Sequence, residues 1–180
     1  LRTPEAPVEV LPLLTVVPNL SLYTAEARGA LLVRAGAGLR GRALAFAAEG
    51  RGVKVEGKPV PGERTPIAFD TAGLANGRTE VVCRLLEGGQ ELAAATVHLV
   101  KAPPKANEVK IDYAHRGLVV DGLPYLPFGF YCVFPPGNLP TDEAPQGFVH
   151  IGPYQGADPD MAAVKEYLDR CAALGMRVHY

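Results

Sequence analysis

The sequence predicts a mainly β protein, with a sandwich of short strands first and a β/α unit after it. Short apolar or alternating runs, separated by turns rich in glycine and proline, fill residues 1–104. The stiff, polar segment KAPPKA at 101–106 then marks a boundary. The remaining residues follow the order strand, loop, helix, glycine and strand, which is typical of a βα unit that feeds a parallel sheet.

The composition is that of an ordinary globular protein and excludes several classes of function. The chain has 180 residues, of which 48% are hydrophobic, and its net charge is −1. A nearly neutral chain offers no field that would attract nucleic acid, so we expect no nucleic-acid partner. No apolar run approaches the roughly 20 residues that cross a bilayer, so we expect no membrane span.

The three cysteines, Cys83, Cys132 and Cys171, are widely spaced and lie in apolar surroundings. No two of them have the CxxC spacing, so neither a zinc cluster nor a dithiol redox motif is supported. We therefore expect buried, inert thiols, no metal and no cofactor. One disulfide is compatible with this count but not required.

Each expected strand of the first part is a short run bounded by turn residues. Pro12 places the first run at a sheet edge, because proline cannot donate to the strand ladder. Asn76-Gly77 and the EGGQ segment at 87–90 are typical of tight turns. The strands are expected at 8–17, 30–35, 43–48, 53–56, 66–70, 79–86 and 91–100. This spacing fits an immunoglobulin-like β-sandwich over 1–104, although the chain has no tryptophan.

The sandwich shows no catalytic pattern. His98 has no carboxylate or cysteine at ligand spacing, so we expect a structural histidine. The segment 36–41, GAGLRG, matches a phosphate-binding glycine motif only superficially, because a strand rather than a helix is expected after it. Phe46 and Phe69 are expected in the core, which leaves Tyr23 as a possible surface aromatic. One aromatic is too few to stack sugars, so the sandwich is expected to be a spacer or docking module.

The second part, 105–180, is predicted to open with a β-hairpin formed by 109–113 and 118–120. Asp121-Gly122 is a strong turn dipeptide. Two prolines, at 124 and 127, then hold the backbone extended and remove two donors. The run at 128–131 is short and apolar, which suits a strand buried on both faces.

A long loop is expected over 132–157, because this segment is rich in proline and glycine. Asp158 is predicted to cap a helix that ends at Gly175, and 176–180 is predicted to begin a second strand. The expected apolar face of the helix contains Met161, Val164, Tyr167, Leu168, Cys171, Ala172 and Leu174. A complete barrel of eight βα units needs about 250 residues, so 105–180 is predicted to be the start of a truncated (β/α)8 barrel.

Two segments resemble a known group of enzymes. Residues 118–131, LVVDGLPYLPFGFY, resemble the entry to the catalytic (β/α)8 (TIM) barrel of many glycoside hydrolases, where it follows β-sandwich domains. Residues 167–180, YLDRCAALGMRVHY, resemble the first helix and second strand of that barrel. The resemblance covers about residues 107–180 and implies a carbohydrate-active enzyme that hydrolyses glycosidic bonds.

The resemblance also implies where the chemistry lies. The paired catalytic carboxylates of these families sit on later strands, so they are expected beyond this chain, which would be inactive alone. Asp142 and Glu143 do not match the catalytic positions. Because such active sites lie at the carboxyl ends of the strands, the predicted substrate-binding residues are Phe130, Tyr131 and His179. An aromatic ring there could stack on a sugar, and a histidine could bond a hydroxyl.

The leading hypothesis is the N-terminal part of a secreted or periplasmic glycoside hydrolase. The chain begins at Leu1, so it is expected to be a processed or excised piece from which a signal peptide could have been removed. The alternative is a non-catalytic cell-surface or adhesion protein that uses the sandwich for protein contacts. A third hypothesis is a barrel enzyme of other chemistry. Acids at the ends of later strands would favour the enzyme, and the sequence makes no prediction about the oligomeric state.

Overall fold

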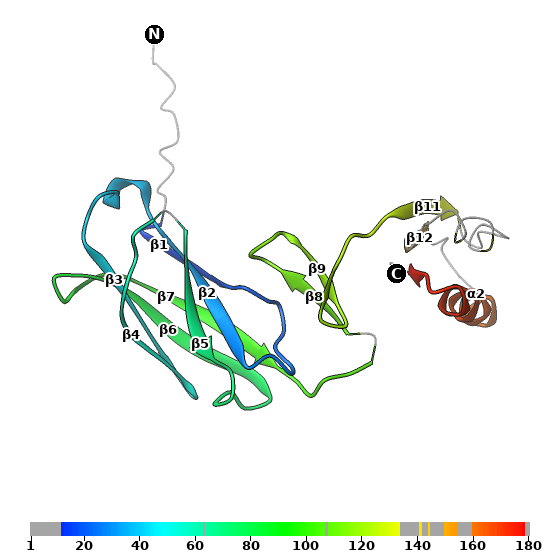
Figure 1. The fold of residues 1–180 in the computed structure, drawn as a ribbon, viewed down its shortest axis with the longest axis horizontal. Helices are drawn as coiled ribbons and strands as arrows, with labels where there is room; N and C mark the ends of the chain where they lie inside the picture. Colours follow the sequence, from blue (N-terminus) through cyan, green and yellow to red (C-terminus); the bar gives the residue numbers. More distant parts are fainter. Residues whose placement is uncertain are drawn as a thin grey trace, which may run out of the picture. The chain divides into compact units, whose positions relative to one another are not determined.

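The structure is a computed structural model that describes residues 12–62, 64–106, 108–133, 141, 144, 150–154 and 160–178. The chain forms two compact units, of which the first ends at Tyr125 and the second begins at Leu126. The described part is mainly β, as predicted (Figure 1). None of its helices is both long and apolar enough to cross a membrane.

The first unit contains a β-sandwich of two antiparallel sheets (Figure 1). The strand order is β1-β2-β5 in one sheet and β4-β3-β6-β7 in the other. The elements are β1 (Leu14–Pro18), β2 (Arg28–Ala35), the short 3-10 helix η1 (Ala37–Leu39), β3 (Leu44–Gly50), β4 (Val53–Pro59), β5 (Thr65–Asp70), β6 (Gly77–Glu87) and β7 (Gln90–Lys101). The prediction of a sandwich is therefore confirmed, and six of the expected strands lie within a few residues of their predicted bounds. The first, predicted at 8–17, begins at Leu14, and residues 8–11 lie outside the described residues.

One core cluster joins the inner faces of both sheets. Leu31 and Val33 of β2 are fully buried, and so are Val81 and Leu85 of β6. Their spacing by two or four residues follows the period of a strand, which places alternate side chains on one face. Each such side chain contributes about 1.5–3 kcal/mol by leaving water. Cys83, between them on the same face, is a buried free thiol, as predicted.

Tyr23 belongs to this core, so its prediction as a possible surface aromatic is wrong. Its exposed fraction is only 1%. Its ring packs edge-on against Phe69, with the centroids 5.5 Å apart, and its hydroxyl donates to Asn19 Oδ1 at 2.8 Å. A side chain at Gly29 would meet both rings, since a Cβ there would lie 2.5 Å from Phe69. The polar tip is satisfied inside the protein, which is why this tyrosine tolerates burial.

A smaller antiparallel sheet of order β10-β9-β8 completes the first unit. It consists of β8 (Val109–Asp112), β9 (Gly117–Val120) and β10 (Leu123–Tyr125). Asp121 and Gly122 form the turn between β9 and β10, with φ values of 50° and 81°. Positive φ at both residues suits a tight hairpin and favours the Asp-Gly pair. The sequence did not predict β10, because this segment contains Pro124. Since β10 is an edge strand, the missing backbone donor of the proline costs little stability.

The predicted domains, 1–104 and 105–180, stay a prediction. The first compact unit of the structure includes the sheet of β8, β9 and β10, which was predicted to belong to the second domain. In this sheet Val119 packs against the core cluster of the sandwich. Val109 and Ile111 of β8 are exposed, and the intervening Lys110 is buried.

The second unit contains a parallel sheet of order β11-β12-β13. Its elements are β11 (Gly129–Val133), β12 (His150–Tyr154), α2 (Met161–Ala173) and β13 (Arg177–Val178). The prediction of an uninterrupted loop over 132–157 is wrong, because β12 lies within it. The sequence did not predict β12, because this segment contains Pro153 and proline is unfavourable in a central strand. As a result β13 pairs with β12 and is not the direct neighbour of β11.

The helix begins two residues later than predicted. Its N-cap is Asp160, whose Oδ1 accepts the Ala162 amide at 3.0 Å, and not Asp158, which lies outside the described residues. Its end agrees with the prediction: Gly175 has φ +71°, and the Met176 amide donates to the Cys171 carbonyl at 2.9 Å.

The buried face of α2 is narrower than the sequence predicts. Val164, Tyr167 and Cys171 are buried, whereas the predicted core residues Met161 and Leu168 are 70% and 38% exposed. Tyr167 and Cys171 pack with Met176, which leads into β13. This small cluster holds the helix to the third strand of the sheet.

Candidate functional site

The candidate substrate-binding edge is the carboxyl edge of the parallel sheet in the second unit. Strands β11, β12 and β13 run in the same direction, so their carboxyl ends meet at one edge. Phe130 lies level with Ile151, and Ile151 lies level with Val178. Tyr131, the next residue of β11, lies level with Gly152. His179 directly follows Val178 and lies outside the described residues, as Asp142 and Glu143 do.

Phe130 and Tyr131 do not end their strand. They are the second and third of the five residues of β11, which continues to Val133. The role of both residues in substrate binding stays a prediction.

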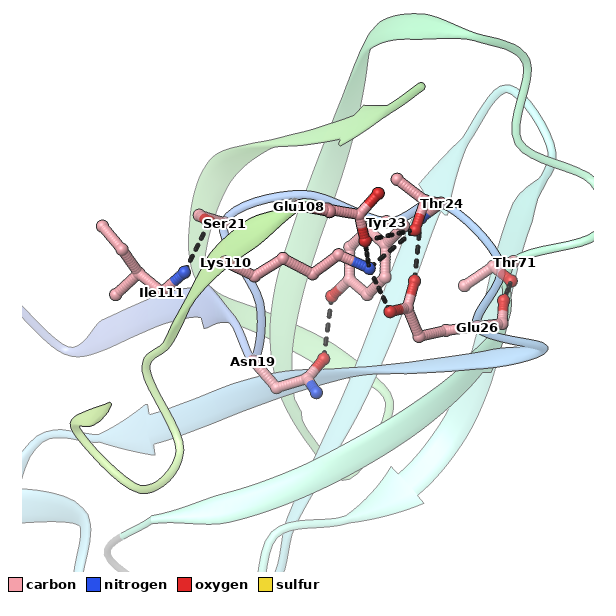
Figure 2. Close-up of polar contacts among 9 residues, drawn as sticks. All are labelled: Asn19, Ser21, Tyr23, Thr24, Glu26, Thr71, Glu108, Lys110 and Ile111. Carbon is pink, nitrogen blue, oxygen red and sulfur yellow. Dashed lines mark hydrogen bonds and ion pairs between the residues drawn. The ribbon is translucent and has the colours of Figure 1, made fainter. Parts of the chain in front are cut away.

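The best-defined polar cluster of the described residues lies in the first unit, where Thr24, Glu26, Glu108 and Lys110 meet (Figure 2). We call this cluster the Lys110 junction. The Lys110 ammonium donates to Thr24 Oγ1 at 2.7 Å, lies 2.6 Å from Glu108 Oε1 and also bonds the Glu26 carboxylate. A lysine has three donors, and three acceptors surround this one. The Lys110 side chain is 3% exposed, so these three acceptors replace almost all of the water that would otherwise hydrate its ammonium.

The other groups of the junction are also paired (Figure 2). The Thr24 hydroxyl donates to Glu108 Oε1 at 2.8 Å, and the Thr24 amide donates to Glu26 Oε2 at 2.8 Å. Glu26 also supplies its backbone carbonyl to the hydroxyl of Thr71, a buried residue. The junction therefore connects β8 and the residue before it to the segment that links β1 to β2.

Backbone bonds along the same two segments extend the junction. The Ser21 amide donates to the Ile111 carbonyl at 3.0 Å. The Ile111 amide donates to Ser21 Oγ at 2.9 Å (Figure 2). The Tyr113 amide donates to the Asn19 carbonyl at 2.8 Å. These bonds and the buried ammonium fix the β8–β10 sheet against the sandwich.

The electrostatics of the junction keep both carboxylates ionised. Burial alone would raise the pKa of Glu26, but hydrogen bonds from Lys110 and the Thr24 amide outweigh it, so this pKa is below its usual value. Hydrogen bonding to Lys110 likewise lowers the pKa of Glu108. Burial opposes the charge of Lys110, yet its bonds to the two carboxylates raise its pKa above the usual value.

These directions argue against a catalytic role for the carboxylates of the junction. A glycosidase needs one carboxylic acid that stays protonated near neutral pH, which requires a raised pKa. The pKa values of Glu26 and Glu108 are lowered instead, and the Lys110 ammonium lies between the two carboxylates. The junction is therefore a structural connection. Sequence reasoning missed it because Lys110 and Glu26 are 84 residues apart and no local pattern links them.

His98 and Cys83 also have structural roles. His98 lies opposite Glu80 across β6 and β7, with Nε2 3.6 Å from Oε2, and forms a surface pair of small energetic value. Burial raises the pKa of Cys83 to about 12, so its thiol stays protonated and unreactive near neutral pH. Among the residues that the structure describes, no three His, Cys, Asp or Glu side chains are grouped to hold a metal ion.

Comparison with known proteins gives structural neighbours only. No protein-family model matches the chain, and no curated protein sequence matches it. A glycosyl hydrolase family 2 member from Bacteroides cellulosilyticus aligns at 14% identity and a TM-score of 0.35, covering 91% of this chain and 25% of its own. The Parabacteroides merdae beta-glucuronidase aligns at 12% identity and a TM-score of 0.33, covering 93% and 23%.

The Ruminococcus gnavus beta-glucuronidase aligns at 12% identity and a TM-score of 0.31, covering 93% of this chain and 29% of its own. The chain thus spans 23–29% of the length of these three solved structures. All three neighbours are glycosidases, each of them similar to this chain at low identity.

Proposed function

We propose that residues 1–180 are the N-terminal part of a glycoside hydrolase-like enzyme that cleaves glycosidic bonds. The catalytic carboxylates of this enzyme would lie outside the chain, on later strands of a (β/α)8 barrel. The substrate would be a carbohydrate, and the protein would be secreted or periplasmic. Hydrolysis would use two carboxylates, whose separation would determine retention or inversion of configuration.

The observation that carries the proposal is the parallel sheet β11-β12-β13 with α2 leading into its third strand. β11 begins in the segment 118–131 that resembles the entry to a glycoside hydrolase barrel, and the end of α2 and β13 lie in the segment 167–180 that resembles its first helix and second strand. Parallel strands joined through helices are the repeating unit of such barrels. In this interpretation β12 is the second barrel strand and β13 the third, so His179 would follow the third strand.

The proposed site lies at the carboxyl edge of this sheet, where one aromatic side chain of β11 would contact the sugar. Phe130 and Tyr131 are the candidates for this contact, because both lie on β11. Replacing the contact residue by alanine should raise KM, because the sugar loses a stacking surface. Replacing the other should lower stability and leave KM unchanged. The two alanine variants are matched controls for each other.

The test compares the native protein from its source with the isolated 180-residue chain on a panel of aryl glycosides. We expect the native protein to hydrolyse at least one glycoside and the isolated chain to hydrolyse none. The proposal is overturned if the native protein cleaves no member of the panel. It is also overturned if the isolated chain cleaves one at a rate that a point substitution within it abolishes.

A further inference from the structure

The connection between β5 and β6 ends with an asparagine that is directly followed by a glycine (Figure 1). Asn76 and Gly77 are both exposed, and Gly77 is the first residue of β6. The pair favours a tight turn, but it also has a reactivity of its own. The backbone nitrogen after an asparagine can attack the carbon of the side-chain amide, provided that both groups are accessible.

The side chain of Asn76 is not held by the surrounding structure. Within the described residues it makes no hydrogen bond. Asn19 provides the contrast, because its Oδ1 accepts the Tyr23 hydroxyl at 2.8 Å and the Ala30 amide at 2.7 Å. The side-chain amide of Asn76 can therefore rotate toward the Gly77 nitrogen, whereas that of Asn19 is fixed.

Gly77 leaves the attacking nitrogen accessible. It has φ +108°, and beyond its chain neighbours no heavy atom lies within 4 Å of the position that a Cβ would take. Because glycine has no Cβ, nothing on the residue itself hinders the approach of the asparagine side chain. Gly77 pairs with Lys101, the last residue of β7, so this pair lies at the end of the ladder. Such ends open at little cost in free energy.

The first half of the connection is anchored, in contrast to Asn76. Thr71 is buried, and its carbonyl accepts the Lys101 ammonium at 2.7 Å. Leu74 is also buried, and its amide donates to the Thr71 carbonyl at 3.1 Å. The three residues that follow, 75–77, are all exposed. A reaction at Asn76 therefore requires no opening of the sandwich core.

We infer that Asn76 deamidates spontaneously in the folded protein, through a succinimide ring that it forms with Gly77. The Gly77 nitrogen loses its proton and bonds to Asn76 Cγ, and the side-chain nitrogen leaves as ammonia. Water then opens the ring at either carbonyl, which yields aspartate or isoaspartate. The reaction consumes only water and needs no oxidant. It is independent of the proposed hydrolase activity.

Both products change the connection. Each replaces a neutral side chain by a carboxylate and so makes the chain more negative. In the isoaspartate form the backbone also runs through the side chain, which lengthens it by a methylene between Leu74 and Gly77. This change would displace the end pair of the β6–β7 ladder and leave the pairs beyond it in place.

Tryptic digestion and mass spectrometry of the native protein, after incubation at neutral pH, test the inference. Trypsin releases residues 65–78, TPIAFDTAGLANGR, in which Asn76 is the sole asparagine. We expect this peptide to gain the mass that replaces NH2 by OH, in two forms that separate by chromatography. The gain should be faster at alkaline pH, because the attacking nitrogen must lose its proton.

Three controls separate the structural claim from the chemistry. Residues 3–28 contain only Asn19, which is held and is followed by leucine, so this peptide should keep its mass. Asn76→Gln should abolish the gain in 65–78, because the longer side chain cannot close the succinimide. Synthetic peptide 65–78 gives the rate without a fold. The folded protein should react within about tenfold of it, since tenfold corresponds to only about 1.4 kcal/mol of opening.

The inference is overturned if residues 65–78 of the folded protein keep their mass while the synthetic peptide gains it. It is also overturned if Asn76→Gln gains mass at the same rate, or if residues 3–28 react as fast as 65–78. Circular dichroism during the incubation establishes that the protein stays folded. Failure of the glycoside panel would leave this inference untouched, because the two readouts share no step.

Discussion

Removing the ammonium of Lys110 is the sharpest perturbation that the structure offers. Lys110→Met keeps the length of the aliphatic chain and removes the charge. Glu26 and Glu108 then lose their shared cation, with side-chain exposures of 27% and 14%. Breaking a buried ion pair from one side costs about 3–5 kcal/mol. Because water can still reach both carboxylates in part, we expect the lower end, about 3 kcal/mol.

This loss should be readily visible. For a unit of this size, about 3 kcal/mol corresponds to a fall in Tm of roughly 10–15 °C. Urea unfolding followed by far-UV circular dichroism reports mainly on the sandwich, because most described strands lie there. The matched control is Lys58→Met on the edge strand β4, where the side chain is exposed, and it should change stability by less than about 0.5 kcal/mol. Equal losses in the two variants would refute the reasoning.

The pH dependence of this loss has a defined sign. The folded-state pKa values of Glu26 and Glu108 are lowered, so their contribution is present above the unfolded value of about 4.3 and is lost as the pH falls through the folded values. The pKa of Lys110 is raised, so its contribution is lost as the pH rises above about 10.4 and through its folded value. The difference between wild type and Lys110→Met should therefore be constant from about pH 5 to 10 and shrink below about pH 4. A difference that grows on acidification would contradict the assigned shifts.

Three further predictions concern single groups. Tyr23→Phe removes the bond to Asn19 and should cost about 1 kcal/mol in urea unfolding, whereas Tyr113→Phe, at an exposed position, should cost nothing measurable. Asp160→Ala removes the cap of α2 and should cost the second unit about 1 kcal/mol; a loss no greater than that of Asp169→Ala, which breaks only a surface pair, would argue against the cap. Cys83 should not react with a thiol reagent in the native protein at pH 8, since its pKa is about 12, and reaction without unfolding would contradict its burial.

The sandwich could be predicted from the sequence because its signals are local. Strands with period-two burial, such as β6 with Val81, Cys83 and Leu85 facing inward, carry their pattern in a few consecutive residues. Turn dipeptides such as Asp121-Gly122 favour a particular backbone conformation, here with positive φ at both residues. Local chemistry alone therefore identified the strands and most of the turns.

The features that could not be predicted depend on partners far away in the chain. Lys110 is buried because Glu26 and Thr24 come to it from 84 and 86 residues away. Tyr23 is buried because its ring packs against Phe69, which is distant in the chain, while the nearby Asn19 accepts its hydroxyl. In β12, parallel pairing to β11 and β13 outweighs the unfavourable effect of Pro153.

The candidate site could be predicted only in outline. The resemblance led to β11 and to the carboxyl edge of a parallel sheet, and Phe130 and Tyr131 do lie on β11. It misplaced the end of that strand and omitted β12, because the intervening segment carries prolines and glycines in place of a strand pattern.

The most direct test of the central claim is the intact mass of the native protein from its source, together with its C-terminal sequence. We expect a mass at least ~20 kDa above the 19.1 kDa of these residues, because a complete barrel needs about 250 residues. We also expect two carboxylates at the ends of later strands. A native mass near 19.1 kDa would contradict the hydrolase proposal and would favour a non-catalytic protein built on the sandwich.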